Sequence, residues 1–230
     1  MKFSEKEHAA VLIAYYEGFI KALGEDSGRA AFLLAERQYG ERRGRRMAQR
    51  ALRDGFPLDF TSYFAYGELI TTPGGYEGSY EASEGLVHEV QHKCPWASAF
   101  REQGGMACAK LYCSEIDAAV VRGFNWLLDY RYGGNMHEQG CCVFDFRSPE
   151  LDGDSLGSGA RKAPEGRVNR FDMTWHTADV YQIFKKVCEN VCPKAADAVR
   201  EVLRNRLGDE AFEFLEKLSE EDHDSIDQTC

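Results

Sequence analysis

Residues 111–125 read LYCSEIDAAVVRGFN, and this stretch joins a helical pattern to two chemically active side chains. Its apolar residues recur at helical spacing, which predicts a helix over roughly residues 107–122. Cys113 and Asp117 stand four positions apart, so a helix projects them from one face with their Cβ atoms about 5–6 Å apart. The Gly-Phe-Asn segment at 123–125 breaks the pattern and is expected to end the helix. The thiol and the carboxylate therefore share a face, either as packing and solvation or as chemistry.

Helical periodicity continues on the N-terminal side of this stretch. Residues 5–23 form an apolar pattern that ends at Gly24, and glycine is a common residue at the end of a helix. A second helix is expected to start after a Ser27 cap. Gly40 and Gly44 are expected to interrupt it, because glycine weakens a helix interior.

Seven arginines lie in this second helix, between residues 37 and 53. They could form an anion-binding strip, or they could be a solvated face whose aliphatic stems cover apolar surface. The acidic charge of the whole chain and the lack of interleaved aromatic side chains favour the solvated face.

Two segments have the alternation that is typical of strands. Residues 85–93, GLVHEVQHK, are expected to form a strand that ends at Cys94, and Pro95 then suits the first turn of a short helix. Residues 126–146 alternate on both sides of the sequence HEQG, which predicts a hairpin with its turn there. Residues 61–72, TSYFAYGELITT, are rich in β-branched and aromatic side chains, which favours extended structure in an otherwise mixed region.

These patterns together predict the α+β class, with helices packed against a small, mainly antiparallel sheet. Residues 148–169 are rich in glycine, serine, proline and charge and lack apolar periodicity, so we expect a loop or linker there. Residues 170–230 carry further helical patterns. We therefore expect a domain over residues 1–147, the linker, and a helical C-terminal extension packed on the same domain.

Composition limits the kinds of partner. The chain has 230 residues, 43% of them hydrophobic, and 28 basic and 38 acidic residues give a formal net charge of −10. A chain of this size can bury a core, and its acidic balance argues against nucleic acid or an anionic membrane as a partner. No stretch approaches the roughly 18 apolar residues of a transmembrane helix, and the N-terminus lacks the pattern of a signal peptide. We expect a cytoplasmic protein that binds a small molecule, with assembly into a homo-oligomer left open.

Eight cysteines, five of them between residues 94 and 142, are the strongest compositional feature. In a reducing compartment they are expected to be buried thiols, metal ligands or catalytic groups rather than disulfides. Cys188 and Cys192 are four residues apart on a helical apolar stripe, which favours core packing over a metal site. Cys142 has the same strand parity as Phe144 and is expected to point inward.

Spacing alone does not make Cys113 a good nucleophile. Asp117 would raise the pKa of the thiol by charge repulsion unless the carboxylate binds a substrate amine, orients a water or shares a metal. A buried thiol beside a solvated carboxylate is therefore the interpretation that spacing favours. A zinc ion or other divalent metal would have to gather Cys94, Cys113 and Cys142 from separate segments, and no zinc-binding spacing is present.

His88 and His92 have one parity on the expected strand and so project to one face. A histidine pair of this kind can ligate a metal or act as general bases, but a solvated or hydrogen-bonded strand face is the favoured interpretation. The sequence has no glycine-rich phosphate loop, no GxSxG elbow and no HExxH metal motif.

The order of three motifs resembles the L-2-amino-thiazoline-4-carboxylic acid hydrolase family. The motifs are VQHKCPWASAFREQG, LYCSEIDAAVVRGFN and GCCVFDF, and the resemblance is firm over about residues 85–147. The two N-terminal helices also suit the family, whereas the part after the linker lies outside the resemblance. The matching residues are Cys94, Pro95, Trp96, Cys113, Asp117, Gly123, Phe124, Asn125, Gly140, Cys142 and Phe144.

The resemblance implies a hydrolase that opens a C–N bond in a small cyclic amidine of the 2-amino-thiazoline-4-carboxylate type, giving an N-carbamoyl-cysteine. Cys113 is then expected to attack the ring or to position a water, while Asp117 holds or protonates the amidine nitrogen. Cys142 completes the expected catalytic set, and one arginine of residues 37–53 is expected to bind the substrate carboxylate. The expected substrate-binding residues are Asn125, Cys94 and His88.

A non-catalytic interpretation stays open beside this one. The family core is similar to vinyl-reductase-like small-molecule-binding domains, some of which hold zinc through cysteines in a late hairpin. The chain would then be a sensor-like protein that binds a small molecule or a metal, with Cys94, Cys113 and Cys142 as the candidate ligands. In a third interpretation the C-terminal helices are an interaction arm without a catalytic role.

Overall fold

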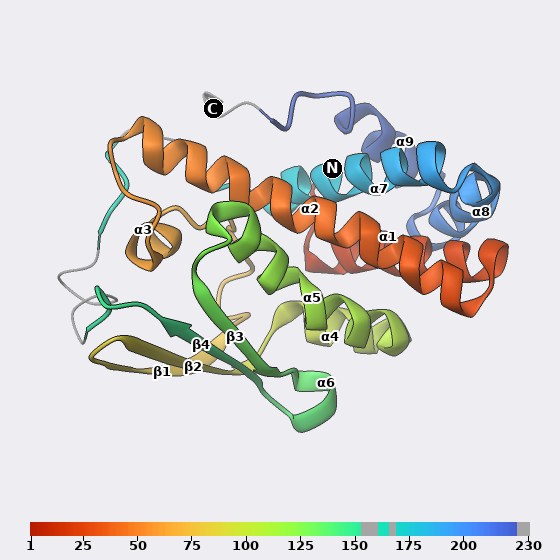
Figure 1. The fold of residues 1–230 in the computed structure, drawn as a ribbon. Helices are drawn as coiled ribbons and strands as arrows, with labels where there is room; N and C mark the ends of the chain where they lie inside the picture. The colour runs from red at the N-terminus through yellow and green to blue at the C-terminus, as the bar shows by residue number, and fades with distance from the viewer. Residues whose placement is uncertain (153–160, 166–168, 225–230) are drawn as a thin grey trace.

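Helices cover one side of a small sheet, as Figure 1 shows for this computed structural model. The structure describes residues 1–152, 161–165 and 169–224. Much of the predicted linker therefore lies outside the described residues. The α+β class expected from the sequence is confirmed, because helices dominate the chain and the strands form one antiparallel sheet.

Helices α1 (Glu5–Leu23) and α2 (Glu25–Arg53) start the chain as an antiparallel pair. The Ser4 side chain caps α1 in a capping box with Glu7, which satisfies backbone N–H groups at the helix start. Gly24 has a φ of 82°, a conformation that favours glycine, and it joins the two helices directly. The expected Ser27 cap is therefore wrong, since α2 begins before that residue.

Helix α5 (Met106–Asn125) packs along α2 and forms the centre of the fold. A Cβ atom placed on Gly44 would lie 2.1 Å from the Val120 carbonyl oxygen, and one on Gly123 would lie 2.2 Å from the Glu41 carbonyl oxygen. The two glycines thus mark the closest approach of the two backbones. Helix α2 continues through both Gly40 and Gly44, and α5 continues through Gly123. The expected interruptions at Gly40 and Gly44 and the expected helix end at Gly123 are therefore wrong.

The described strands form one sheet in the order β1-β2-β4-β3, and every neighbouring pair is antiparallel. The strands are β1 (Glu77–Ser83), β2 (Leu86–Lys93), β3 (Asp129–Gly134) and β4 (Cys142–Arg147). The predicted strand at 85–93 and the predicted pairing within 126–146 are confirmed. The connection at HEQG is the one-turn helix α6 (Met136–Gln139) rather than a tight turn.

Two short helices complete the surroundings of the sheet. Helix α4 (Pro95–Glu102) starts at the expected proline. Helix α3 (Phe60–Ala65) occupies part of the segment in which aromatic composition favoured extended structure. The Asp59 side chain accepts a hydrogen bond from the Ser62 backbone N–H at 2.8 Å. This N-cap, together with burial of Phe60, outweighs the strand propensity of the neighbouring aromatic residues.

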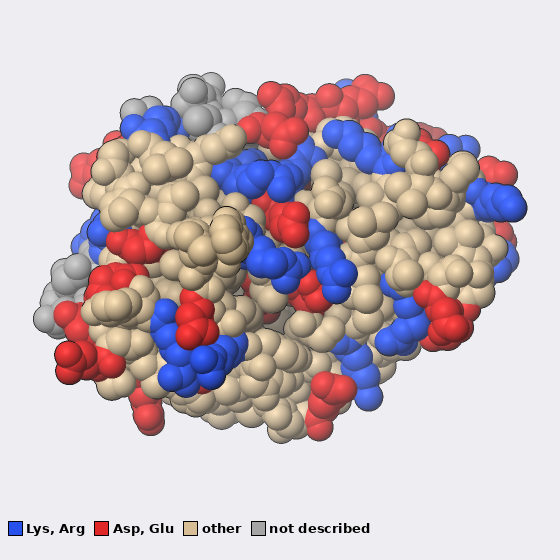
Figure 2. Space-filling view, viewed as in Figure 1, with Lys and Arg blue, Asp and Glu red and all other residues tan. Residues whose placement is uncertain are grey.

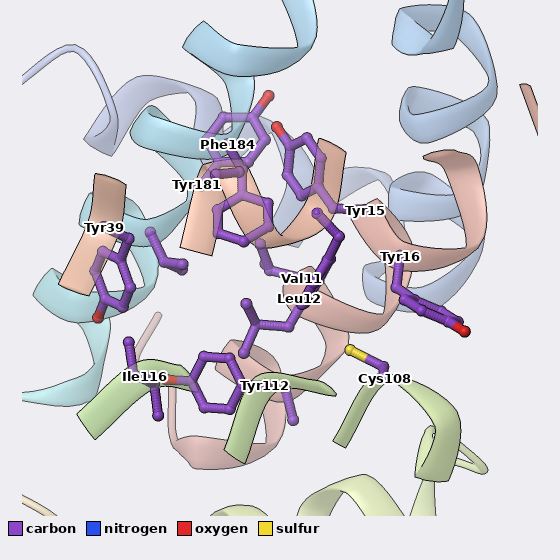
Figure 3. Close-up of a cluster of buried hydrophobic side chains, with 14 of the residues drawn as sticks. Val11, Leu12, Tyr15, Tyr16, Tyr39, Cys108, Tyr112, Ile116, Tyr181 and Phe184 are labelled. Carbon is purple, nitrogen blue, oxygen red and sulfur yellow. The ribbon is translucent and has the colours of Figure 1, made fainter. Parts of the chain in front are cut away.

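The C-terminal helices pack on α1 and α2 rather than extending away from them. They are α7 (Met173–Val191), the 3-10 turn η1 (Pro193–Ala195), α8 (Ala196–Leu207) and α9 (Asp209–Leu218). Figure 3 shows Val11 and Leu12 of α1 between Phe184 of α7 and Tyr112 of α5. One apolar cluster therefore joins the C-terminal helices to the N-terminal part of the chain.

Four arginines of α2 are buried, so the solvated face favoured from the sequence is wrong for them. They are Arg42, Arg43, Arg46 and Arg50. Arg46 forms ion pairs with Glu68 at 3.0 Å and with Asp179 of α7 at 2.7 Å. Both carboxylates come from distant segments, which is why local composition could not indicate them.

No helix within the described ranges is long and apolar enough to cross a membrane. Figure 2 shows basic and acidic side chains interspersed over the face that it draws. A single-sign patch does not dominate this face.

Candidate functional site

A cavity of about 480 Å³ lies between α5 and the face of the sheet that the helices cover. It is lined by Arg43, Tyr63, Phe64, Leu69, Tyr76, Glu89, Gln91, Cys94, Trp96, Tyr112, Cys113, Ile116, Asp117, Tyr130, Cys142, Phe144 and Phe146. The structure therefore brings together four of the expected site residues, the thiols of Cys94, Cys113 and Cys142 and the carboxyl of Asp117. Its size is that of a small-molecule site.

The periodicities of helix and strand explain why these side chains meet. Cys113 and Asp117 project from one face of α5 because they are one helical turn apart. Cys142 begins β4 and points to the same side as Phe144, as strand alternation predicted. Cys94 lies between β2 and α4, where it is the N-cap residue of α4. Helix α5, strand β4 and the start of α4 thus each place one thiol in the cavity.

The cavity thiols are protonated at neutral pH. Burial raises the pKa of Cys113 well above its usual value, and the nearby Cys94 and Asp117 add to this shift. Burial also raises the pKa of Cys142 to about 11. A thiol in this environment needs a base in order to act as a nucleophile.

His137 of α6 supplies a nitrogen next to Cys113, a contact that the sequence did not indicate. The Sγ atom of Cys113 lies 3.4 Å from Nε2 of His137. The other ring nitrogen, Nδ1, is buried without a hydrogen-bond partner in the described structure. Burial lowers the pKa of His137, and Arg101 lowers it further. The imidazole is therefore neutral and can accept a proton.

Two carboxyl groups face the cavity, one from the helix and one from the sheet. Burial raises the pKa of Asp117 to about 6, where Arg43 opposes the shift and Glu89 adds to it. Burial also raises the pKa of Glu89 on β2, and a hydrogen bond from Gln91 opposes that shift. A carboxyl group that titrates near neutral pH can hold a cationic substrate group or transfer a proton.

Arg43 is the arginine of residues 37–53 that lines the cavity. Its Nε atom is 3.8 Å from Glu68 and is buried without a hydrogen-bond partner among the described residues. The guanidinium lies over the Tyr39 ring, 5.6 Å from the ring centre. The cavity lining therefore combines a cationic group with the carboxyl groups of Asp117 and Glu89.

A buried histidine of α1 connects two of the groups around Arg43. The indole Nε1–H of Trp96 donates to Nδ1 of His8 at 3.0 Å, and Nε2 of His8 lies 3.3 Å from the Tyr39 hydroxyl. Because Nδ1 accepts, the ring proton sits on Nε2 and is donated to Tyr39. Burial, aided by Arg43, lowers the pKa of His8 to about 3, so the ring stays neutral.

Two expected substrate-binding residues lie outside the cavity lining. The Asn125 side chain donates to the Leu58 carbonyl at 2.8 Å and accepts from the Leu127 N–H at 3.1 Å, so it fixes the end of α5. His88 pairs with Asp145 at 2.6 Å on the other face of the sheet. Strand alternation points Glu89, not His88, toward the helices. We therefore correct the expectation that Asn125 and His88 contact a ligand in this cavity.

The described ranges contain no group of three or more His, Cys, Asp or Glu side chains close enough to hold a metal ion. The three thiols line one cavity but do not form such a group in this structure. Zinc or another divalent ion bound by Cys94, Cys113 and Cys142 stays a prediction that metal analysis of the protein can test.

Comparison with known protein families gives a match. The family model described as L-2-amino-thiazoline-4-carboxylic acid hydrolase matches residues 4–146. This range runs from the start of α1 into β4 and contains every residue that lines the cavity. No curated protein and no solved structure matches the chain significantly.

Proposed function

Because the chain belongs to the L-2-amino-thiazoline-4-carboxylic acid hydrolase family, we propose that its cavity binds and hydrolyses a 2-amino-thiazoline-4-carboxylate or a closely related cyclic amidine. The observation that carries this proposal is the polarity of the cavity. Arg43 of α2 lines it together with Asp117 and a thiol, Cys113, of α5. A small zwitterion with a carboxylate and an amidinium complements this arrangement.

Arg43 supports recognition of the substrate carboxylate. Its guanidinium lies over the Tyr39 ring, and the residue lines the cavity. Planar, two-pronged hydrogen bonding by arginine suits a carboxylate better than the point charge of lysine. The ring amidinium then lies toward Asp117 and Glu89, which can hold its N–H groups.

The reacting atom is C2, the ring carbon bonded to sulfur, to the ring nitrogen and to the exocyclic nitrogen. Holding the amidine in its protonated form makes C2 more electrophilic, and Asp117 is placed to do so because it is ionised above a pH of about 6. The apolar and aromatic side chains of the lining exclude water around this carboxylate and strengthen its interaction with a cation.

Atom balance identifies the bond that breaks. N-carbamoyl-cysteine keeps both bonds from the former C2 to nitrogen, so its formation breaks the ring C–S bond. Breaking the ring C–N bond would instead give S-carbamoyl-cysteine. We propose the C–S route, because a thiol with a pKa of about 8.5 leaves more readily than an amine. The C–N cleavage expected from the family resemblance is therefore replaced by C–S cleavage in this proposal.

Turnover by the purified protein tests the proposal. We expect 2-amino-thiazoline-4-carboxylate to be consumed, with one ureido product and one new thiol formed per substrate. Arg43→Gln should lower kcat/KM about 10- to 100-fold, mainly by raising KM, since a charged hydrogen bond contributes about 1.5–3 kcal/mol.

Arg45→Gln is the matched control, because Arg45 is on the same helix and its side chain is 55% exposed. It should leave KM unchanged. Equal effects of the Arg43 and Arg45 variants would contradict carboxylate recognition by Arg43. Binding without turnover in the unaltered protein would instead favour the sensor-like interpretation.

A further inference from the structure

We propose that Cys113 and His137 act as a nucleophile and its base, and that the ring opens through a covalent intermediate on the Cys113 sulfur. The inference rests on the proposed function and adds His137 to it as a catalytic residue. It also distinguishes attack by the thiol from direct attack by water, an alternative that the sequence left open.

The contact between the two side chains carries the proposal. The Sγ atom of Cys113 lines the cavity, while Nε2 of His137 reaches the same sulfur from α6 at 3.4 Å. This is hydrogen-bond distance for a thiol donor, so the S–H can point at Nε2. The pair joins α5 to the connection between β3 and β4, which lie together only in the folded chain.

The surroundings hold the imidazole in place. The His137 ring packs edge-on against Phe100, with the ring centres 6.4 Å apart. The backbone N–H of His137 donates to Oδ1 of Asn135, a buried residue, at 2.9 Å. The packing against Phe100 and the backbone hydrogen bond together keep Nε2 aimed at the sulfur.

Burial keeps the proton on the Cys113 thiol until the substrate is bound. It raises the pKa of the Cys113 thiol and lowers the pKa of the His137 imidazole, so both groups are neutral at rest. The thiol therefore keeps its proton until an electrophile is bound. Proton transfer to Nε2 then accompanies attack, and the amidinium held at Asp117 places C2 next to the sulfur.

In the first step, Sγ of Cys113 bonds to C2 as its proton passes to Nε2 of His137. The tetrahedral adduct then releases the ring sulfur, which takes that proton from His137. C2 stays bonded to Cys113 as an S-linked isothiouronium with two nitrogen substituents. One C–S bond forms and one breaks, so the exchange requires no oxidant or reductant.

In the second step, water adds to C2 and gives a proton to His137, while the extra proton of the isothiouronium passes to Asp117. Collapse of this adduct forms the urea carbonyl and expels the Cys113 sulfur, which recovers its proton from His137. The products are the ureido acid with a free thiol and the unmodified enzyme, once Asp117 has released its proton to solvent. The sum is the addition of one water to the substrate.

Acid quenching of the enzyme with substrate, followed by intact-mass and peptide analysis, detects the intermediate. We expect an adduct on Cys113 with the mass of the whole substrate, because no water has yet been added. His137→Gln should slow adduct formation about 10²- to 10⁴-fold, the usual contribution of a general base. His88→Gln is the control, because His88 lies on the opposite face of the sheet and should leave the rate unchanged.

A second measurement does not depend on turnover. We expect His137→Gln to slow alkylation of Cys113 by iodoacetamide near neutral pH, followed by peptide mass, whereas His88→Gln should not. Turnover that persists in Cys113→Ala would overturn the covalent step and leave the proposed function standing. Absence of turnover would contradict the proposed function, and unchanged alkylation in His137→Gln would overturn the pair in either case.

Discussion

At the scale of single residues, the cavity combines groups that would be costly to bury without a ligand. Arg43 brings a buried guanidinium to the lining, and Asp117 brings a carboxyl to the same largely apolar cavity. Buried charges are normally paired, so charged groups that line a cavity favour a ligand of complementary charge. A zwitterionic substrate would satisfy both residues at once.

The titration of Asp117 leads to a prediction about pH. Burial raises its pKa to about 6, so the carboxylate becomes protonated as pH falls through this value. Arg43 and Glu89 are the charged groups that face it from α2 and β2. If the ionised form holds the amidinium, kcat/KM should fall below pH 6 by about tenfold per pH unit.

The Asp117→Asn variant should have low activity and should lose this limb of the pH profile. Glu115→Gln serves as the control, because Glu115 is on the same helix but pairs with Arg37 and Arg122 away from the cavity. That variant should keep the limb near pH 6. A limb that persists in Asp117→Asn would assign the titration to another group.

The sequence predicted the residues whose placement depends on local geometry. Helical spacing put Cys113 and Asp117 on one face, and strand parity pointed Cys142 inward. His137 was missed because its nitrogen meets Cys113 only after β3 and β4 pair and α6 closes the connection. Strand parity could have indicated Glu89 as a cavity residue, but only once the face of β2 that meets the helices was known.

At the scale of elements, the contact between α2 and α5 positions the site. α2 carries Arg43 and α5 carries Cys113 and Asp117, so the packing of these two helices sets how these side chains lie relative to one another in the cavity. Glycines at the crossing allow the two backbones to approach closely. This role could not be predicted from the sequence, because a glycine within a helix can indicate either a break or a close contact.

Gly44→Ala should therefore destabilise the fold. The new methyl group would lie 2.1 Å from the Val120 carbonyl oxygen, so α2 and α5 would have to separate. Overpacking of this kind costs about 1–3 kcal/mol, which should appear as a lower midpoint in urea unfolding. Gly67→Ala is the control, since its Cβ would meet only the Phe64 carbonyl oxygen at 3.7 Å. Equal midpoints for the two variants would contradict the close-approach account.

At the scale of the whole molecule, a buried charge network joins the C-terminal helices to the part that the family model matches. Arg46 pairs with Glu68 and with Asp179 of α7, and it donates to the His223 carbonyl at 3.1 Å. Its guanidinium also lies over the Trp175 ring, 4.7 Å from the centre. The helices beyond the matched range thus complete the burial of α2, the helix that carries Arg43.

Arg46→Met should destabilise the whole chain by about 3–5 kcal/mol, because it leaves Glu68 and Asp179 buried with one less cation. Chemical unfolding followed by circular dichroism measures this effect. Arg45→Met, on the exposed side of the same helix, should change stability by less than about 1 kcal/mol. A small effect of Arg46→Met would mean that the network contributes little to joining the two parts.

The fold class could be predicted because apolar periodicity distinguishes helices from strands along most of the chain. The arrangement of the C-terminal helices could not, because their partners on α1 and α2 are distant in sequence. The same limit explains the arginines of α2, whose carboxylate partners lie on α7 and on the segment after α3. Contacts between distant segments therefore determine which arginine of α2 lines the cavity.

The most direct test of the central claim is turnover of 2-amino-thiazoline-4-carboxylate labelled with ¹³C at C2, followed by NMR. The account predicts that the ring carbon signal is replaced by a ureido carbon signal with release of one thiol per substrate. It also predicts that Cys113→Ala abolishes this change and Arg43→Gln slows it. A folded protein that leaves the labelled ring intact at millimolar concentration, or turnover that neither variant affects, would contradict the account.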